Sequence, residues 1–140
     1  MSRVFFDTNL FIYLIEQVQP QHDRVRDILF RMRERDDELS ASTLTLGELL
    51  VKPIAAGDES LSAKYESLLH QSVSLIPFDA AAARTYARIR QDRSIKAPDA
   101  IQLSCAASAG TDLFVTNDER LSRKTIPGIQ FVTSLDRAFL

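Results

Sequence analysis

The pattern of apolar and polar residues along the chain predicts short strands separated by helices. Five short segments are typical of strands, at residues 3–6, 39–42, 73–78, 112–116 and 130–133. The stretches between them predict helices, at residues 10–15, 21–35, 46–51, 61–70, 79–91 and 99–108. Strands that alternate with helices indicate an α/β fold with a central, mostly parallel sheet.

Residues suited to helix ends mark several boundaries of these segments. Thr8 or Asn9 can cap the first helix, and Asp79 can cap the helix that follows it. Pro98 stands at the favoured first position of the helix over residues 99–108. Pro53 limits or bends the helix that precedes it, because proline lacks the amide hydrogen that continues a helix.

Composition narrows the class of protein. The chain has 140 residues, of which 45% are hydrophobic, and it shows no repeat or flexible linker, so we expect one domain over residues 1–140. No apolar run approaches the ~20 residues that a membrane helix needs, and the first residues lack the apolar stretch of a secretory signal. The single cysteine cannot form an internal disulfide. We therefore expect a cytoplasmic protein that has no membrane partner.

The net charge of −2, from 17 basic and 19 acidic residues, weakly disfavours a nucleic-acid partner. The balance changes if four acids are gathered in one metal site, because the rest of the surface then carries a net charge of +2. Charge therefore permits an RNA substrate without requiring one.

Four acids stand where a parallel α/β fold places its ligand site, beyond the carboxyl ends of the strands. Asp7 and Asp118 each follow a predicted strand. Glu48 interrupts an apolar helix beside Gly47, and Asp99 begins a helix that is apolar on most sides. We expect these four side chains to share a crevice at one edge of the sheet.

Each acid taken alone also has a simpler explanation: a helix cap for Asp7, a solvated helix face for Glu48, a partner for the helix dipole for Asp99, and a turn for Asp118. Together they form a set of hard oxygen ligands of the kind that suits Mg²⁺ or Mn²⁺. Carboxylates packed together repel one another, so such a cluster needs a cation or retained protons. Two ions about 3.5–4 Å apart can activate water for phosphodiester cleavage.

Four segments resemble, in order, the motifs of the PIN-domain family. They are Val4-Phe5-Phe6-Asp7-Thr8-Asn9, Ser42-Thr43-Leu44-Thr45-Leu46-Gly47-Glu48-Leu49, Pro98-Asp99-Ala100-Ile101-Gln102 and Val115-Thr116-Asn117-Asp118. The small size and the four-motif layout also resemble the VapC-like toxins of toxin–antitoxin pairs. The resemblance extends from Val4 to about Val132, and its opening motif is the most specific.

The resemblance implies a PIN-like three-layer α/β/α sandwich with the activity of an endoribonuclease that depends on Mg²⁺ or Mn²⁺. It also implies a homodimer and a cognate antitoxin as partners, with RNA as the substrate. Carried over motif by motif, the metal ligands and catalytic residues would be Asp7, Glu48, Asp99 and Asp118.

The same motifs imply supporting roles for neighbouring polar residues. The segment Thr8-Asn9 would order the first loop, and Thr116 and Asn117 would support the fourth acid. The fourth motif leaves two alternatives, because Asn117 in place of Asp118 could face the metal and Glu119 could substitute for it.

A basic segment leads into the third acid. Residues 84–96 include Arg84, Arg88 and Lys96 and contain a single acid, Asp92. Our hypothesis is that part of this segment binds RNA phosphates beside Asp99. The alternative is an ordinary solvated helix face.

Two apolar stretches, residues 11–14 and 49–54, exceed what a fully exposed helix would carry. Core packing explains most of them, and some are candidates for a dimer or antitoxin surface.

Other classes of protein fit part of the pattern as well. One is a phosphoacceptor receiver-like domain, although such domains have adjacent acids after the first strand where this chain has Asp7-Thr8-Asn9. Another is a PIN-like RNA-binding or interaction module without catalysis.

Overall fold

A computed structural model describes residues 1–138 of the chain, so the last two residues of the expected domain lie outside the described part. Its centre is a parallel sheet of five strands in the order β3-β2-β1-β4-β5. The strands are β1 (Arg3–Phe6), β2 (Glu38–Ser42), β3 (Ser74–Ile76), β4 (Leu113–Thr116) and β5 (Phe131–Ser134). The expectation of a parallel α/β fold is confirmed.

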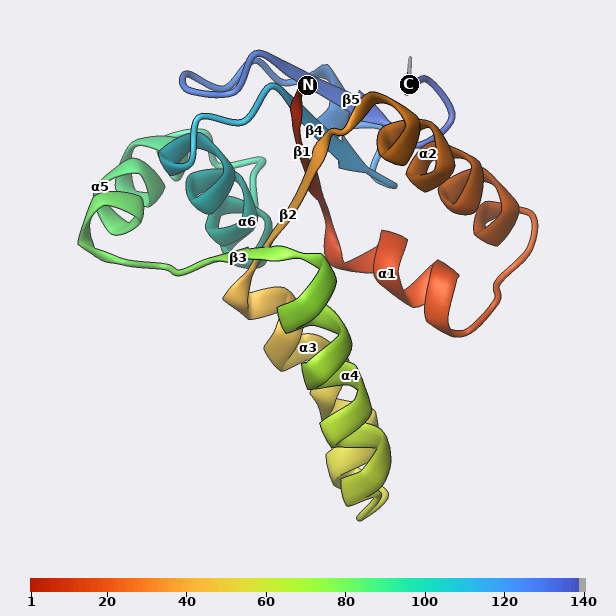
Figure 1. The fold of residues 1–140 in the computed structure, drawn as a ribbon. Helices are drawn as coiled ribbons and strands as arrows, with labels where there is room; N and C mark the ends of the chain where they lie inside the picture. The colour runs from red at the N-terminus through yellow and green to blue at the C-terminus, as the bar shows by residue number, and fades with distance from the viewer. Residues whose placement is uncertain (139–140) are drawn as a thin grey trace.

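Within residues 1–138, six α-helices surround this sheet in layers. They are α1 (Thr8–Ile15), α2 (Gln21–Arg35), α3 (Thr43–Ala55), α4 (Glu59–Ser72), α5 (Ala80–Ile89) and α6 (Ala97–Ser108). A single 3₁₀ turn, η1 (Leu121–Arg123), lies between β4 and β5. Helices α1 and α2 lie on one side of the sheet and α5 and α6 on the other, which gives three layers (Figure 1).

Alternation along the central strand divides the core into two parts. Val4 and Phe6 of β1 belong to the apolar cluster that α1 and α2 cover, whereas Phe5 points to the cluster under α5 and α6. Successive strand residues point to opposite faces, so a strand covered on both faces must be apolar throughout. Phe5 stacks on Phe114 of β4 with ring centroids 5.3 Å apart. The short run that starts the chain therefore serves both cores.

Helices α3 and α4 form a hairpin that extends away from the sheet beyond the carboxyl ends of the strands (Figure 1). Val51, Ile54 and Leu68 on this hairpin are large hydrophobic residues that remain exposed. The hairpin faces α1 across a cleft that is described below.

Helix α1 begins two residues earlier than the expected range of 10–15. Asp7 is the N-cap, and its Oδ1 accepts a hydrogen bond of 2.8 Å from the backbone amide of Thr8. The sequence suggested Thr8 or Asn9 for this role and offered capping by Asp7 as the simpler explanation of that acid. Thr8 lies inside the helix and is buried, because its hydroxyl joins a polar network under the cleft. The expected cap at Asp79 is confirmed by its bond to the amide of Ala82.

Several other boundaries differ from the pattern-based prediction, and α3 and β3 are two examples. Pro53 lies inside α3, which continues to Ala55, because a proline removes only its own amide bond and the helix ends within the next turn. The strand predicted at residues 73–78 is shorter, since β3 has three residues and Val73 still caps α4 through its bond to Leu69.

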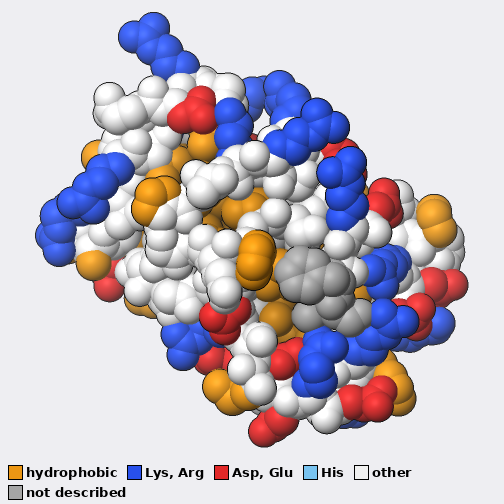
Figure 2. All heavy atoms as spheres, turned by 90° about the horizontal axis from the view of Figure 1, so that it is seen from above, with side chains coloured by type: hydrophobic (Ala, Val, Ile, Leu, Met, Phe, Trp, Pro, Cys, Tyr) orange, Lys and Arg blue, Asp and Glu red, His pale blue; other side chains and the backbone are white. Residues whose placement is uncertain are grey.

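In the part of the chain that the structure describes, no helix has the length and apolar character to cross a membrane. Figure 2 shows the molecule from above, at the end of the sheet where the chain begins. Blue Lys and Arg side chains and red Asp and Glu side chains are interspersed around this face (Figure 2). The face therefore carries both signs of charge.

Candidate active site

The site begins where β1 and β4 end side by side. The amide of Asp7 continues the ladder with a bond of 3.0 Å to the carbonyl of Val115. Thr116, the next residue of β4, donates its hydroxyl to Oδ2 of Asp7 at 2.9 Å. Together with the Thr8 amide on Oδ1, this bond fixes both oxygens of a carboxylate that is only 8% exposed. The pairing of two parallel strands thus orients the first acid.

A buried polar network lies beside Asp7 and ends at the second acid. The hydroxyl of Thr8 donates to Oε1 of Glu48 at 2.7 Å and lies 2.8 Å from the hydroxyl of Thr45. Gln102 of α6 donates its side-chain amide to both threonine hydroxyls, at 2.9 and 3.0 Å. One oxygen of Glu48 is therefore held by side chains from two other helices.

The third acid comes from the first turn of α6. Asp99 is half-buried there, one turn before Gln102 on the same helix. Burial raises the pKa of Asp99, and the carboxylate of Asp118 adds to this shift, while Lys96 and Arg120 oppose it. Each of these three charges is close enough to act on Asp99, and of the three only Arg120 received no role from the sequence.

The fourth acid follows β4 in a tight turn. Oδ1 of Asp118 accepts bonds from the amides of Arg120 and Leu121, at 2.9 and 3.3 Å, and the Asp118 amide donates to the hydroxyl of Thr116. The preceding Asn117 is exposed, and its Oδ1 accepts a hydrogen bond of 3.0 Å from the side-chain Nδ2 of Asn9. This contact joins the first turn of α1 to the loop that follows β4.

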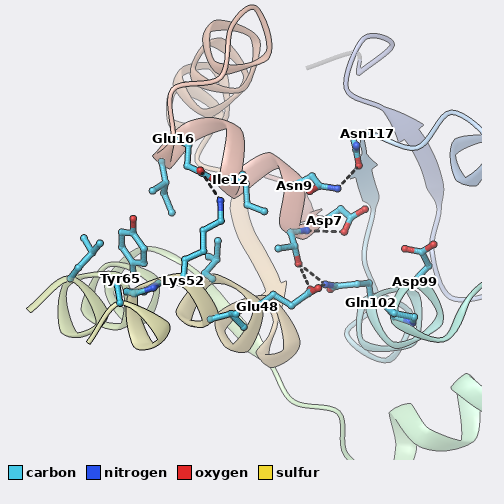
Figure 3. Close-up of a pocket in the computed structure, with 18 of the residues that line it drawn as sticks. Asp7, Asn9, Ile12, Glu16, Glu48, Lys52, Tyr65, Asp99, Gln102 and Asn117 are labelled. Carbon is cyan, nitrogen blue, oxygen red and sulfur yellow. Dashed lines mark hydrogen bonds and ion pairs between the residues drawn. The ribbon is translucent and has the colours of Figure 1, made fainter. Parts of the chain in front are cut away.

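All four acids line one cleft of about 830 Å³. Figure 3 shows its two ends: Asp7, Asp99 and Gln102 lie at one end, and Tyr65 and Lys52 on the α3–α4 hairpin lie at the other. The far end is largely apolar, and its lining includes Ile12, Ile15, Leu49, Val51, Pro53, Ala56, Leu61 and Tyr65. Lys52 of α3 and Glu16 at the end of α1 form an ion pair of 3.1 Å at this end (Figure 3). A polar end and an apolar end therefore share one continuous cleft.

The donor set of the polar end suits a hard divalent cation, because its acids offer only oxygen and no His or Cys lines the cleft. Among residues 1–138, no three acids, histidines or cysteines lie close enough to hold one ion as they stand. Hydrogen bonds already engage one oxygen each of Glu48 and Asp118 and both oxygens of Asp7. Burial, helped by the carboxylates of Asp99 and Glu48, raises the pKa of Asp7 to about 6 against the opposing hydrogen bonds from Thr116 and Thr8. A cation between these carboxylates would relieve their burial and repulsion.

The three basic residues expected to bind substrate are separated in the structure. Lys96 caps α6 beside Asp99, and its charge acts on that acid. Arg88 of α5 lines a different cavity of about 290 Å³, next to Ile126 and Pro127, and the exposed Arg84 lines neither cavity. Phosphate binding by this basic segment therefore stays a prediction, and of the three residues Lys96 has the most suitable position.

Two residues of the site received no role from the sequence. Gln102 was part of a recognised motif, and the available signal was a polar side chain in an otherwise apolar helix. Arg120 lies 3.9 Å from Oδ1 of Asp118 through its Nε, and its only signal was its position two residues after that acid. Contacts with distant segments assign Gln102 to the site, and the effect of Arg120 on the pKa of Asp99 assigns Arg120.

The fold and the cleft define the class: a three-layer α/β/α protein with a cluster of carboxylates at the carboxyl ends of a parallel sheet. The PIN-domain family model matches residues 4–126, and the chain belongs to this family. Ribonuclease VapC23 from Mycobacterium tuberculosis is 27% identical over 121 residues, which cover 85% of this chain and 95% of the relative.

Solved structures with the same fold come from toxin–antitoxin complexes. VapBC2 from Rickettsia felis, bound to a promoter DNA fragment, superposes with a TM-score of 0.73 at 18% identity, covering 94% of this chain and 98% of that one. DNA-bound VapBC from Salmonella typhimurium gives 0.68 at 21% identity, covering 96% and 99%. At these identities the likeness establishes the fold, and it confirms the expected PIN-like sandwich.

Replacing Thr116 by Val tests how the first acid is held. We expect the free energy of unfolding of the metal-free protein to fall by about 1–3 kcal/mol, because an oxygen of Asp7 and the amide of Asp118 both lose a buried partner. Urea unfolding measures this change. Thr85→Val on α5, whose hydroxyl bonds only to the carbonyl of Ala81 among the described residues, should stay within about 0.5 kcal/mol of the wild type. Equal effects of the two substitutions would contradict the proposed support of Asp7.

Proposed function

We propose that this protein is a metal-dependent endoribonuclease and the toxin of a toxin–antitoxin pair. The observation that carries the proposal is the gathering of Asp7, Glu48, Asp99 and Asp118 around one cleft in a member of the PIN-domain family. The similarity to a relative named as a ribonuclease supports the choice of RNA.

The four acids would hold Mg²⁺ or Mn²⁺ through their carboxylate oxygens. When bound, the ion supplies Lewis-acid polarisation of a phosphate oxygen and a water molecule that ionises more easily. Asp7 offers a fixed position, because Thr8 and Thr116 hold both of its oxygens. Asp118 would have to exchange one of its backbone contacts, so Asn117 and Glu119 remain alternatives as the fourth ligand.

Other groups at the polar end of the cleft would bind a phosphate of the RNA. The amino end of α6 enters the cleft at Asp99, and a helix amino terminus favours a negatively charged group. Lys96 and Arg120 add positive charge near the same acid. In the hydrolysis, the water oxygen bonds to phosphorus, the bond from phosphorus to the leaving ribose oxygen breaks, and that oxygen gains a proton. The role of these cations is to bind and orient the phosphate.

Neutralising one central acid should abolish cleavage. We expect Asp7→Asn and Asp99→Asn each to lower the rate of RNA cleavage in Mg²⁺ or Mn²⁺ by at least about a hundredfold, because each removes a metal ligand. The assay uses the full chain, freed of any bound partner, with a pool of structured RNAs and EDTA controls. Asp92→Asn is the matched control, since Asp92 is exposed, pairs with Lys124 and does not line the carboxylate cleft.

Three results of this assay would speak against the proposal. Cleavage that survives both substitutions would move the active site elsewhere. Cleavage that persists in EDTA would remove the metal. If the RNA pool stays intact and calorimetry detects no Mn²⁺ binding, the chain is a PIN-like module without catalysis.

The position of Lys96 beside Asp99 generates a prediction about affinity. In the inactive Asp7→Asn background, Lys96→Glu should weaken RNA binding at low salt by about tenfold and lower the slope of log K against log salt by about one, because a phosphate contact is lost. Arg88→Glu makes the same charge change on α5 outside the cleft, and its effect should be clearly smaller. Filter binding across a salt series measures both. An effect of Arg88→Glu equal to that of Lys96→Glu would indicate a general charge effect. A DNA of the same sequence shows whether the site selects RNA.

The apolar end of the cleft supports the proposal of an antitoxin partner. Val51 on α3 and Ile12 and Ile15 on α1 line the same cavity as the acids, so an amphipathic segment lying there would block access to them. The similar solved structures are themselves toxin–antitoxin complexes.

Exposed Ile54 and Leu68 on the hairpin suit a second apolar contact, and we propose the homodimer there. A reducing cytoplasm would suit the buried Cys105, which forms no disulfide.

Introducing a charge at the apolar end should release such a partner. Val51→Asp should weaken binding of the cognate antitoxin by at least about tenfold, because a desolvated contact gains an unpaired charge. Phe30→Asp makes a similar change at an equally exposed position of α2 outside the cleft and should leave this affinity unaltered. Calorimetry on both variants measures the effect. Wild-type affinity of Val51→Asp would place the partner elsewhere.

A further inference from the structure

Gln102 is a buried amide that connects four parts of the fold below the carboxylate cleft. It lies on α6, is only 2% exposed, and contacts Ser42 at the end of β2, Thr8 of α1, and Thr45 of α3. Its amide nitrogen also comes within 3.5 Å of Oε1 of Glu48 (Figure 3). None of the roles assigned above to the four acids explains why an amide is buried here.

The orientation of this amide follows from Ser42. The Ser42 hydroxyl oxygen accepts the amide hydrogen of Thr45 as the cap of α3, and its own hydrogen goes to Oε1 of Gln102 at 2.6 Å. The nitrogen of Gln102 must then face the two threonine hydroxyls. The helix cap therefore determines which side of Gln102 donates.

A count of hydrogens fixes the direction of every bond in the network. Ser42, Thr8 and Thr45 each contribute one hydroxyl hydrogen and the Gln102 amide contributes two, which gives five hydrogens for five short contacts. Thr8 donates its hydrogen to Glu48, so Thr45 must be the donor in its contact with Thr8. The reversed amide would leave two of the short contacts without a hydrogen. The series of hydrogen-bond donors therefore runs from Ser42 through Gln102 and the two threonines and ends at Oε1 of Glu48.

We propose that Gln102 is a positioning residue for Glu48. With Gln102 donating to Thr8 and Thr45, and Thr45 donating to Thr8, the Thr8 hydrogen is the one that serves the contact with Oε1 of Glu48. That oxygen is held in the network, while Oε2, which receives no hydrogen bond within residues 1–138, stays available to a cation. The inference rests on the proposed function, in which Glu48 is a metal ligand. Groups that orient a metal ligand typically contribute about 10–100-fold to metal affinity or activity.

The test compares Mn²⁺ affinity in four versions of the full chain by calorimetry: wild type, Gln102→Met, Glu48→Gln and the double variant. Methionine keeps the length and burial of the side chain and removes the donors. We expect Gln102→Met to raise the dissociation constant for Mn²⁺ by about tenfold or more. In the Glu48→Gln background the same substitution should change it by less than about twofold, because residues that act through each other are not additive.

Two variants serve as controls for folding. Ser104→Ala removes another buried hydroxyl of α6, which within residues 1–138 bonds only to the carbonyl of Ile101, and it should leave Mn²⁺ affinity unaltered. If Gln102→Met lacks a cooperative thermal unfolding transition, Thr45→Val replaces it in the same cycle. That variant keeps the shape of the side chain and removes the donor to Thr8, so the same coupling to Glu48 is expected.

The outcomes separate the two proposals. An affinity loss that disappears in the Glu48→Gln background supports the positioning role. Wild-type affinity of a folded Gln102→Met variant would overturn it, as would a loss that persists in full without the Glu48 carboxylate, because the role would then be structural. Absence of Mn²⁺ binding by the wild type would overturn the proposed metal site, and the positioning role with it.

Discussion

Asp7 lies at the end of the central strand, where a carboxylate is removed from most of its water. Two hydrogen bonds, from the Thr8 amide and the Thr116 hydroxyl, replace only part of that hydration. The pKa of Asp7 is therefore still raised, to about 6. The position of the other site residues follows from this acid. It caps α1, it needs β4 as the neighbour of β1, and it places negative charge where Glu48 and Asp99 already contribute theirs. The fold thus retains an electrostatic cost that a cation at the same point would remove.

The order of the strands explains how residues more than a hundred positions apart meet. β1 lies between β2 and β4, so the segments that leave these three strands emerge together at one edge. They carry Asp7 from β1, the cap of α3 from β2, and Thr116 with Asp118 from β4. Helix α6 then crosses this edge with Asp99 in its first turn and Gln102 one turn later. Sheet order, rather than any local motif, assembles the cleft.

Most of this arrangement could be read from local patterns. Apolar runs followed by an acid identified β1 and β4, and the rule for parallel sheets predicted that Asp7 and Asp118 would lie at one edge. Local rules were less informative where several residues competed for one role. Three polar residues in a row could each cap α1, and tertiary bonds drew Thr8 into the core and left Asp7 as the cap. Likewise, spacing placed Arg88 on a basic helix without showing that this helix faces away from the cleft. The role of Gln102 depends on contacts to residues 57 to 94 positions away, which no local pattern contains.

Glu48 differs from the other three acids in the element that carries it. Asp7, Asp99 and Asp118 lie at the ends of elements beside the sheet, whereas Glu48 lies within α3, which also carries Leu49, Val51 and Lys52 of the apolar end. A helix is stiff along its axis, so a movement at one end of α3 displaces the other. The same rigid body therefore sets both the width of the cleft and the distance from Glu48 to the remaining acids. Through α3, a molecule that occupies the apolar end of the cleft is therefore mechanically coupled to the distance between Glu48 and the other three acids.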